Sequence, residues 1–445
     1  MTIFPSRLRP MHLALLLAWG AGSGLVQAQS LVELYRAAQD YDATYQSAKI
    51  LYDSSVFKAE QSRALALPTV TLGAVGTQNQ RNSSSANPQD LIYTTQNATL
   101  SATQPLYRPS NTATMEQSKK QLEQARTVLD AADQDLIVRV SQAYFDVLGA
   151  QDTLTFVRAQ KTAVAEQLAS AKRNFEVGTA TITDTREAQA RFDLVVAQEI
   201  AAENDLRVKK LAMDQLVGKN GSQPKPLATT ALPELQPTNP QAWVDQGLRQ
   251  HPTVLKAKLQ VDVAKLDTAI AQAGHKPTLD LTASSYVNRQ NSGSDLNAID
   301  STLTRQNIGL TFSLPLFAGF ATTNKIKETL ALEDKARSDL EAAQRTVEQA
   351  TRTAYFGVLS SMGQVKAFEA AETSSQVALD ANKLGYQVGV RINIDVLNSQ
   401  SQLYQTKRDL AKARYDVLLG SLKLRQANGT LKSDDLQGVN ALLAP

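Results

Sequence analysis

The sequence predicts a mainly α-helical protein with a smaller β-strand contribution, built from two copies of one unit. The first observation is an internal repeat whose landmarks return in the same order at a nearly constant spacing. Gly178 has an equivalent 211 positions later at Gly389, and Tyr144 has an equivalent at Tyr355 with the same spacing. The second is a pair of very long segments with helical patterning, and the third is a pair of alternating segments typical of β-hairpins. Chance matches would scatter, so the chain is predicted to be a duplication.

Composition limits the classes of protein to consider. The chain has 445 residues and a formal net charge of +3, and its basic residues form no cluster, so nothing favours nucleic acid as a partner. It contains no cysteine, which excludes disulfides, a thiolate nucleophile and cysteine-bound metal. His251 and His275 have no other ligand at metal-binding spacing beside them, and no catalytic motif is present. We therefore expect no enzyme activity, no metal and no cofactor.

The first 28 residues are predicted to be a cleaved signal peptide. Arg7 and Arg9 form a basic start, an apolar centre follows at 11–19, and residues 26–28 (Val-Gln-Ala) form a small-residue cleavage site. The apolar centre is too short to span a bilayer, which takes about 20 residues. An uncleaved amphipathic N-terminus is the alternative. No later segment has the roughly 18 apolar residues of a spanning helix, so any later membrane segment must consist of strands.

Each copy has the same succession of segments: a helix, a β-hairpin with a long polar loop, and a long helical hairpin. The first copy covers residues 29–223 and the second 241–445, with a proline-rich linker at 224–240. The predicted first helices cover 31–66 and 241–273, the β-hairpins 67–107 and 277–317, and the helical hairpins 110–217 and 322–427.

The alternation within the predicted strands favours a membrane β-barrel. In residues 278–283 apolar Leu, Leu and Ala alternate with Thr, Asp and Thr, and residues 307–314 alternate in the same way. Segments of about ten residues with one apolar face, joined by long polar loops, are typical of outer-membrane strands. A soluble hairpin that buries its apolar face on a helix is the alternative. Four strands are too few to close a barrel, which takes about eight, so a barrel requires an oligomer.

The helical hairpins are too long to fold into a compact core. Residues 110–176 contain no proline and would extend about 100 Å at ~1.5 Å per residue. Leucines recur at sevenfold spacing, as in the narrow seam of a coiled coil. Each long helix then meets a Val-Gly pair, and glycine commonly ends a helix in a left-handed conformation. We therefore expect Gly178 and Gly389 to mark the tips of two projecting hairpins.

In combination, these features resemble the TolC-type outer-membrane efflux proteins. The resemblance rests on the duplicated unit, the segments GHKPTLDLTAS (274–284) and GLTFSLPLF (309–317), the repeated Ala-Tyr-Phe motif and the Val-Gly tips. It covers residues 31–445. It implies a homotrimer in which each protomer gives four strands to a twelve-stranded barrel in the outer membrane of a Gram-negative bacterium, with the helices forming a periplasmic tunnel. Such channels are the outer exit of tripartite efflux pumps and type I secretion systems. Their partners are a periplasmic adaptor (membrane fusion) protein and an inner-membrane transporter, ABC-type or proton-driven.

The resemblance also implies roles for residues at the tips. Asp395 matches the aspartate that forms an acidic ring at the tunnel entrance. Asn398 stands where the family often has a second aspartate, which predicts weaker cation block. Asp184, Tyr386 and Arg391 match the groups that form the closed-state latch. The residues that match the adaptor-contact grooves are Val177, Gly178, Thr179, Val388, Gly389 and Val390.

Each tip residue also has a plain structural interpretation. Asp184 with Glu187 is a plausible capping pattern at a helix start. Arg391 and Asp395 are four positions apart and can pair along one helix, and Tyr386 can pack in a helical seam. Two other function classes also fit a long helical hairpin: a periplasmic adaptor and a trimeric coiled-coil surface protein. The tandem duplication with paired strands favours the exit channel over both. The sequence does not indicate whether drugs or secreted proteins are the cargo.

Overall fold

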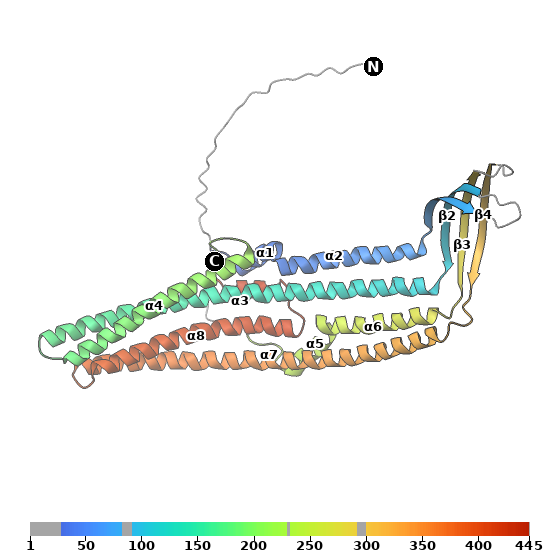
Figure 1. The fold of residues 1–445 in the computed structure, drawn as a ribbon. Coiled ribbons are helices and arrows are strands. Elements are labelled where there is room, and N and C mark those ends of the chain that lie inside the picture. The colour runs from blue at the N-terminus through green and yellow to red at the C-terminus, as the bar shows by residue number, and fades with distance from the viewer. Residues whose placement is uncertain (1–27, 82–90, 229–231, 292–299, 445) are drawn as a thin grey trace, which may run out of the picture.

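The computed structural model describes residues 28–81, 91–228, 232–291 and 300–444. The predicted signal peptide therefore lies almost entirely outside the described residues, as do most of both strand loops and part of the linker. Within these ranges the chain forms a long helical body with a four-stranded sheet at one end (Figure 1). This confirms the predicted fold class, a mainly α-helical chain that contributes four β-strands.

The two copies contain equivalent elements in the same order. The first copy holds α1 (Leu31–Tyr41), α2 (Ala43–Arg63), the short 3-10 helix η1 (Ala64–Ala66), β1 (Thr69–Arg81), β2 (Leu91–Tyr107), α3 (Pro109–Glu176) and α4 (Ile182–Val217). The second holds α5 (Pro240–Gln250), α6 (Pro252–Ala273), β3 (Thr278–Asn291), β4 (Ser301–Ser313), α7 (Ala321–Gln387) and α8 (Asn393–Ala427), and α9 (Asp435–Asn440) follows.

The prediction of one continuous helix at the start of each copy is wrong, because both segments are broken by a single residue. Asp42 ends α1, and its side chain accepts the Tyr45 amide at 2.8 Å as the N-cap of α2. His251 holds the equivalent place 209 positions later and caps α6 through Nδ1, which accepts the Thr253 amide at 3.1 Å. A break of one residue barely disturbs the apolar periodicity, so the sequence pattern did not reveal it.

Asp42 also joins this break to α3. Arg139 donates to both carboxylate oxygens of Asp42, at 2.8 and 2.9 Å, and this paired hydrogen bond lowers the pKa of Asp42. A carboxyl whose pKa is lower in the folded than in the unfolded protein stabilises folding at pH values above its unfolded pKa of about 4. That stabilisation is lost as the pH falls through the lowered folded value.

We expect Arg139→Gln to lower the thermal midpoint at neutral pH and to weaken the dependence of stability on acid. The change leaves the Asp42 carboxylate, whose side chain is 10% exposed, without its cation, at a cost of about 1–3 kcal/mol after discounting for the partly exposed arginine. Circular dichroism melts at neutral pH and at about pH 3 test this. Arg345→Gln, which removes an exposed pair with Glu341, is the control. Equal losses at both pH values would contradict the linkage.

The sheet brings the two copies together edge to edge. Its order is β1-β2-β3-β4 with antiparallel pairs, so β2 of the first copy lies beside β3 of the second. The register collects apolar residues of all four strands on one face: Val70 pairs with Ala102, Ala102 with Ala283, and Ala283 with Ile308. Val70 and Ile308 are 65% and 79% exposed. One chain therefore presents an uncovered apolar face and, at β1 and β4, two sheet edges that pair with no other named strand in the described ranges.

The polar face of the sheet meets the helical body through an ion pair between the copies. Arg108, which precedes α3, donates from Nε to Oδ1 of Asp280 at 2.8 Å and from Nη2 to Oδ2 at 2.6 Å. Asp280 lies on β3 and is only 7% exposed. The two-pronged geometry fixes the direction in which α3 leaves the sheet. Periodicity gave no sign of this pair, because its members are far apart in the chain.

The helical body is long and narrow. α3 has 68 residues and α7 has 67, so each would extend about 100 Å. α4 and α8 fold back along them from tips at the end opposite the sheet (Figure 1). The largest buried cluster lies where the copies meet in the middle and includes Leu31 of α1, Tyr144 of α3 and Leu418 of α8. Among the helices that the structure describes, none is both long and apolar enough to cross a membrane.

Candidate gate and docking site at the helical tips

The backbone of the two tips is nearly identical. Gly178 and Gly389 have φ angles of 79° and 80°, in the left-handed region that glycine adopts without strain. After Gly178, the amides of Thr179 and Ala180 both donate to the carbonyl of Asn174. After Gly389, the amides of Val390 and Arg391 both donate to the carbonyl of Gly385. Both turns thus satisfy the last carbonyls of the incoming helix in the same way.

The helices that leave the two tips differ in their caps. Thr181 caps α4: its hydroxyl accepts the Asp184 amide at 3.2 Å, and the Asp184 carboxylate accepts the Thr181 amide at 2.9 Å. The plain capping interpretation of Asp184 therefore needs a correction, because its partner is Thr181 and not Glu187. In the second copy Ile392 holds the N-cap position and offers no side-chain acceptor. The turn at Gly389 is held without this reciprocal pair.

Asp395 occupies the place in α8 that Asp184 occupies in α4, but its environment differs. Its carboxylate lies 3.8 Å from the guanidinium of Arg391, which belongs to the turn just before α8. Both side chains are substantially exposed, at 34% and 58%, so the pair contributes at most about 1 kcal/mol. The aliphatic part of Arg391 lies against Gly385, where an added Cβ would come within 2.6 Å of it. This contact holds the start of the arginine side chain beside α7.

Polar contacts between the hairpins involve residues that the sequence interpretation did not name. The Asn174 amide donates to the Tyr386 hydroxyl at 3.2 Å, which connects α3 to α7. Arg191 of α4 donates to Asn398 of α8 at 2.7 Å. Asn393 is fully buried; it accepts from Gln167 and donates to the backbone carbonyl of Asp184 at 3.2 Å. These bonds set the register between the two hairpins near the tips.

The structure thus connects the predicted site residues only in part. Tyr386 contacts Asn174, and Arg391 lies beside Asp395, whereas the Asp184 side chain bonds only to Thr181 among the described residues of one chain. Asn393 was detectable in principle. It is a polar residue at a buried helix start where the first copy has Ile182, and a comparison of the two copies shows this difference.

The residues predicted to contact an adaptor form exposed apolar ends on both hairpins. Val177 is 72% exposed, and Val388 and Val390 are 65% and 75% exposed. A Cβ added at Gly178 or Gly389 would meet nothing within 4 Å, so the surface at each turn is open. Apolar side chains concentrated at the end of a soluble helical rod are typical of a protein-docking surface.

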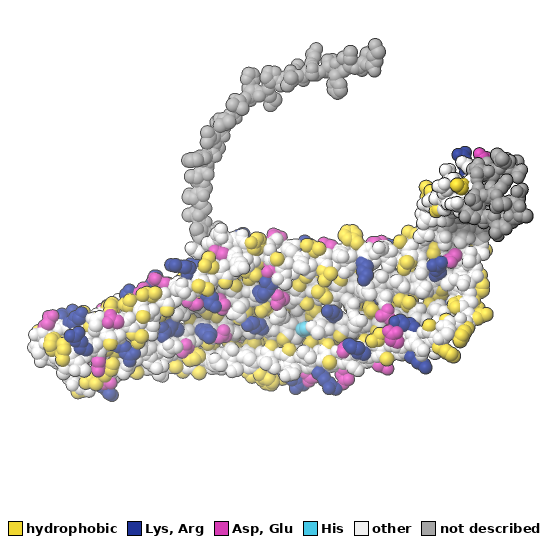
Figure 2. All heavy atoms as spheres, viewed as in Figure 1, with side chains coloured by type: hydrophobic (Ala, Val, Ile, Leu, Met, Phe, Trp, Pro, Cys, Tyr) yellow, Lys and Arg dark blue, Asp and Glu magenta, His cyan; other side chains and the backbone are white. Residues whose placement is uncertain are grey.

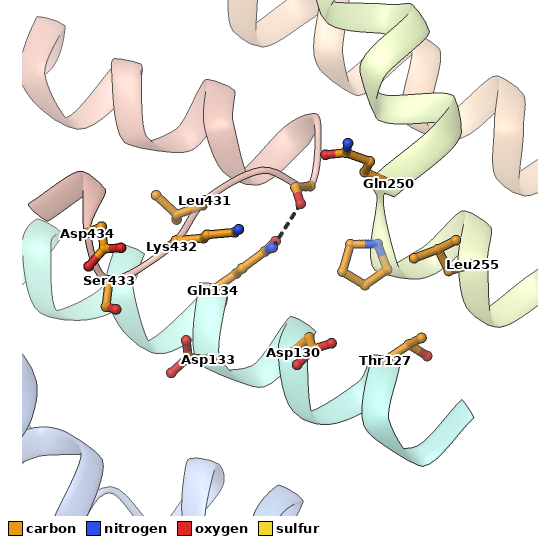
Figure 3. Close-up of a pocket in the computed structure, with 12 residues that line it drawn as sticks. Thr127, Asp130, Asp133, Gln134, Gln250, Leu255, Leu431, Lys432, Ser433 and Asp434 are labelled. Atoms are coloured by element: carbon orange, nitrogen blue, oxygen red, sulfur yellow. Dashed lines mark hydrogen bonds between the residues drawn. The ribbon is translucent and has the colours of Figure 1, made fainter. Parts of the chain in front are cut away.

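A separate cavity of about 350 Å³ lies in the middle of the body, where α3, the α5–α6 break and the C-terminal segment meet (Figure 3). Gln134 crosses it and donates to the Gly429 carbonyl at 3.1 Å. Gly429 has a φ of 74°, and a Cβ there would lie 2.3 Å from the His251 Cα. The described residues contain no cluster of three potential metal ligands here or elsewhere. We assign the cavity to the joint between the two copies.

Two helical hairpins with open tips at one end, and a four-stranded sheet with an apolar face at the other, define an exit channel of the outer membrane. The chain belongs to the outer membrane efflux protein family, whose model matches residues 34–219 and 243–430. This confirms the resemblance stated from the sequence and the function of outer-membrane exit channel for efflux and type I secretion. The members of the family are channel proteins.

Individual relatives match most of the chain. Outer membrane protein TolC of Vibrio cholerae is 35% identical over 426 residues, which span 95% of this chain and 96% of the relative. The alkaline protease secretion protein AprF of Pseudomonas aeruginosa is 32% identical over 360 residues, or 79% and 73% of the two chains. Among solved structures, the outer membrane protein VceC of Vibrio cholerae has a TM-score of 0.76 at 19% identity, covering 90% of this chain and 96% of that one. The open state of the Neisseria gonorrhoeae MtrE outer membrane channel has a TM-score of 0.72 at 18% identity, covering 91% and 90%.

Proposed function

We propose that three copies of this chain form one channel, with a twelve-stranded barrel in the outer membrane and a helical tunnel in the periplasm. The supporting observation is the way in which the two copies of the unit contact each other within one chain. The most extensive contacts between them in the described part of the chain are β2 with β3, α3 with α6, and α3 with α8. Repeated between chains, the same contacts would join β4 with β1, α7 with α2, and α7 with α4 of a neighbour. A head-to-tail contact of this kind forms a ring when its rotation closes, and we propose that it closes after three chains.

The surfaces that would form the α7–α4 contact are uncovered in one chain. Within the chain, Phe145 of α3 is 3% exposed and stacks on Tyr415 of α8, with ring centroids 5.7 Å apart. Its equivalent on α7, Phe356, is 55% exposed. On α4, which corresponds to α8, Val208 and Leu211 are 51% and 62% exposed. Both helices therefore expose the apolar side chains that an α7–α4 contact between neighbouring chains requires.

The α7–α2 contact has matching charge. Within the chain Gln117 of α3 donates to Asp267 of α6 at 2.6 Å. The equivalent positions are Glu328 on α7 and Lys58 on α2, which carry opposite charges. Glu328 pairs with a lysine of its own helix in one chain, and Lys58 is exposed. Between protomers, attraction of Glu328 to Lys58 would take the place of the Gln117–Asp267 hydrogen bond that joins the two copies within one chain.

Cross-linking tests this arrangement cleanly, because the sequence contains no cysteine. Phe356→Cys combined with Asn204→Cys places thiols at the equivalents of Phe145 and Tyr415. A short bis-maleimide is expected to give covalent dimers and trimers on denaturing gels and no larger species. Each single variant is a control and should remain monomeric. A ladder beyond three chains, or no cross-link in the double variant, would contradict the proposed ring.

The same proposal assigns roles to the tips. Three Asp395 side chains would form an acidic ring at the periplasmic entrance, and Asp184, Tyr386 and Arg391 would form the closed-state latch. The exposed turns at Gly178 and Gly389 would contact a periplasmic adaptor that connects the channel to an inner-membrane transporter, and residues 1–28 would direct export.

Two relatives are named for secretion of proteases, in Pseudomonas aeruginosa and Dickeya chrysanthemi. We therefore expect deletion of the gene to reduce protein secretion. Measuring drug susceptibility in the same strain tests efflux, and a strain unchanged in both would contradict the proposal.

A further inference from the structure

The four strands carry few charges, although charged side chains are common elsewhere on the molecule. Figure 2 shows acidic and basic side chains spread along the helical body. Among the strand side chains that the structure describes, the charged ones belong to Asp280, Arg289 and Arg305. Asp280 is bound to Arg108 and is 7% exposed, whereas both arginines are exposed. The arginines are therefore the charges that the sheet presents to its surroundings.

The strand register places the two arginines on opposite faces of the sheet. Successive residues of a strand point to opposite faces, and directly paired residues share a face. Arg289 lies an even number of residues from Ala283 on β3, so it belongs to the apolar face. Arg305 pairs with Tyr286, which lies an odd number of residues from Ala283, so Arg305 belongs to the polar face. In the proposed barrel the apolar face meets lipid and the polar face lines the lumen.

The neighbours of Arg305 on the polar face leave its charge uncovered. Gly73 of β1 and Thr99 of β2, which lie in line with Arg305 across the sheet, are small. A Cβ added at Gly73 would meet nothing within 4 Å, so the space above that position is open. The Tyr286 hydroxyl donates to Asn97 of β2 at 3.0 Å, which holds the tyrosine toward β2 and away from β4. The Arg305 guanidinium is thus free to interact with a passing solute.

We propose that Arg305 is a charge-selecting residue of the channel, and that three copies form a ring of guanidinium groups inside the barrel. The proposal rests on the proposed function, because it takes the trimer and the apolar sheet face in lipid as given. Rings of positively charged side chains favour anions in a pore. A guanidinium also matches the oxygens of carboxylate and phosphate groups, so the ring would attract passengers that carry these groups.

This ring would act independently of the acidic ring at the tips. Arg305 lies in the sheet, whereas Asp395 lies at the far end of a helical body about 100 Å long. That separation far exceeds the Debye length, which is about 10 Å at 0.1 M salt. The channel would therefore hold two filters of opposite sign in series, with cations enriched at the periplasmic entrance and anions enriched in the barrel.

Reversal potentials under a salt gradient in planar bilayers test the ring, since they give the ratio of anion to cation permeability. The full-length channel is compared with Arg305→Gln, which removes the charge, and with Arg305→Lys, which keeps it. Arg289→Gln is the matched control, because it removes the same charge from the opposite face of the same sheet. Each protein is measured at 0.1 M and at 0.01 M salt, where the Debye length is about 30 Å.

We expect Arg305→Gln to lower the ratio of anion to cation permeability about twofold at 0.1 M salt and more at 0.01 M salt. Arg305→Lys and Arg289→Gln should keep the ratio of the unmodified channel. An unchanged ratio in Arg305→Gln at both salt concentrations would overturn the ring and leave the channel intact. A change in Arg289→Gln without one in Arg305→Gln would overturn both the ring and the proposed orientation of the sheet. Absence of channels from the unmodified protein would overturn the proposed function itself.

Discussion

Replacing the three residues of the proposed latch together, as Asp184→Ala, Tyr386→Phe and Arg391→Ser, is expected to raise single-channel conductance in planar bilayers. Tyr386 accepts a hydrogen bond from Asn174 at 3.2 Å and so connects the two hairpins of one protomer. Arg391 is exposed and only weakly paired, which leaves its donors available to a neighbouring chain. If each lost bond contributes about 1 kcal/mol, three lost bonds shift the ratio of open to closed states about a hundredfold.

One further variant tests the Tyr386 part of the proposed latch, and a double variant elsewhere on α7 is the control. Asn174→Ala removes the donor to Tyr386 and should reproduce the effect of Tyr386→Phe, with no added effect when the two are combined. The control is the pair Glu341→Ala and Arg345→Ser, which removes an exposed ion pair on α7 away from the tips. Unchanged conductance in the triple variant would show that these residues do not hold the entrance closed.

Introducing Asn398→Asp together with Arg191→Gln is expected to strengthen block by divalent cations. The first change restores a second carboxylate three residues from Asp395, and three protomers would then present two acidic rings. An added attraction of about 1.4 kcal/mol, the value for a divalent cation and one carboxylate at roughly 6 Å in a medium of dielectric constant about 80, raises cation affinity about tenfold. Conductance measured against increasing divalent cation concentration gives this affinity.

The contact between Arg191 and Asn398 makes the second substitution necessary. Arg191 donates to Asn398 at 2.7 Å, so an aspartate there would pair with the arginine inside its own protomer. Asn398→Asp alone should therefore change cation block much less than the double variant, and Arg191→Gln alone should change it little. Equal block in Asn398→Asp and in the double variant would show that Arg191 does not neutralise the ring.

The sequence predicted those parts of the fold that depend on local chemistry. Glycine at the tips and alternation in the strands act within a few residues, so their signals survive in one chain. The breaks at Asp42 and His251 escaped notice because one capping residue hardly alters the periodicity of the flanking helices. The strand order across the copies was not predictable either, since either hairpin edge satisfies the alternation.

The site was predictable to a smaller degree, for a related reason. Resemblance indicated which tip residues to examine, but it gave no information about partners on the other hairpin. Asn174 and Tyr386 are more than 200 positions apart, as are Arg191 and Asn398, and no periodic signal connects such pairs. Polar contacts between helices depend on the exact rotation and height of each helix, which packing of the whole body determines.

The absence of a side-chain cap at Ile392 bears on the shape of the opening. Thr181 and Asp184 give the first turn of α4 a reciprocal cap worth about 1 kcal/mol, and α8 lacks it. Around a ring of three protomers, stiff and yielding turns would then alternate along the rim. The three turns before α8 would move outward more easily than the three capped turns before α4. The pore would then widen into a triangular opening and not into a larger circle.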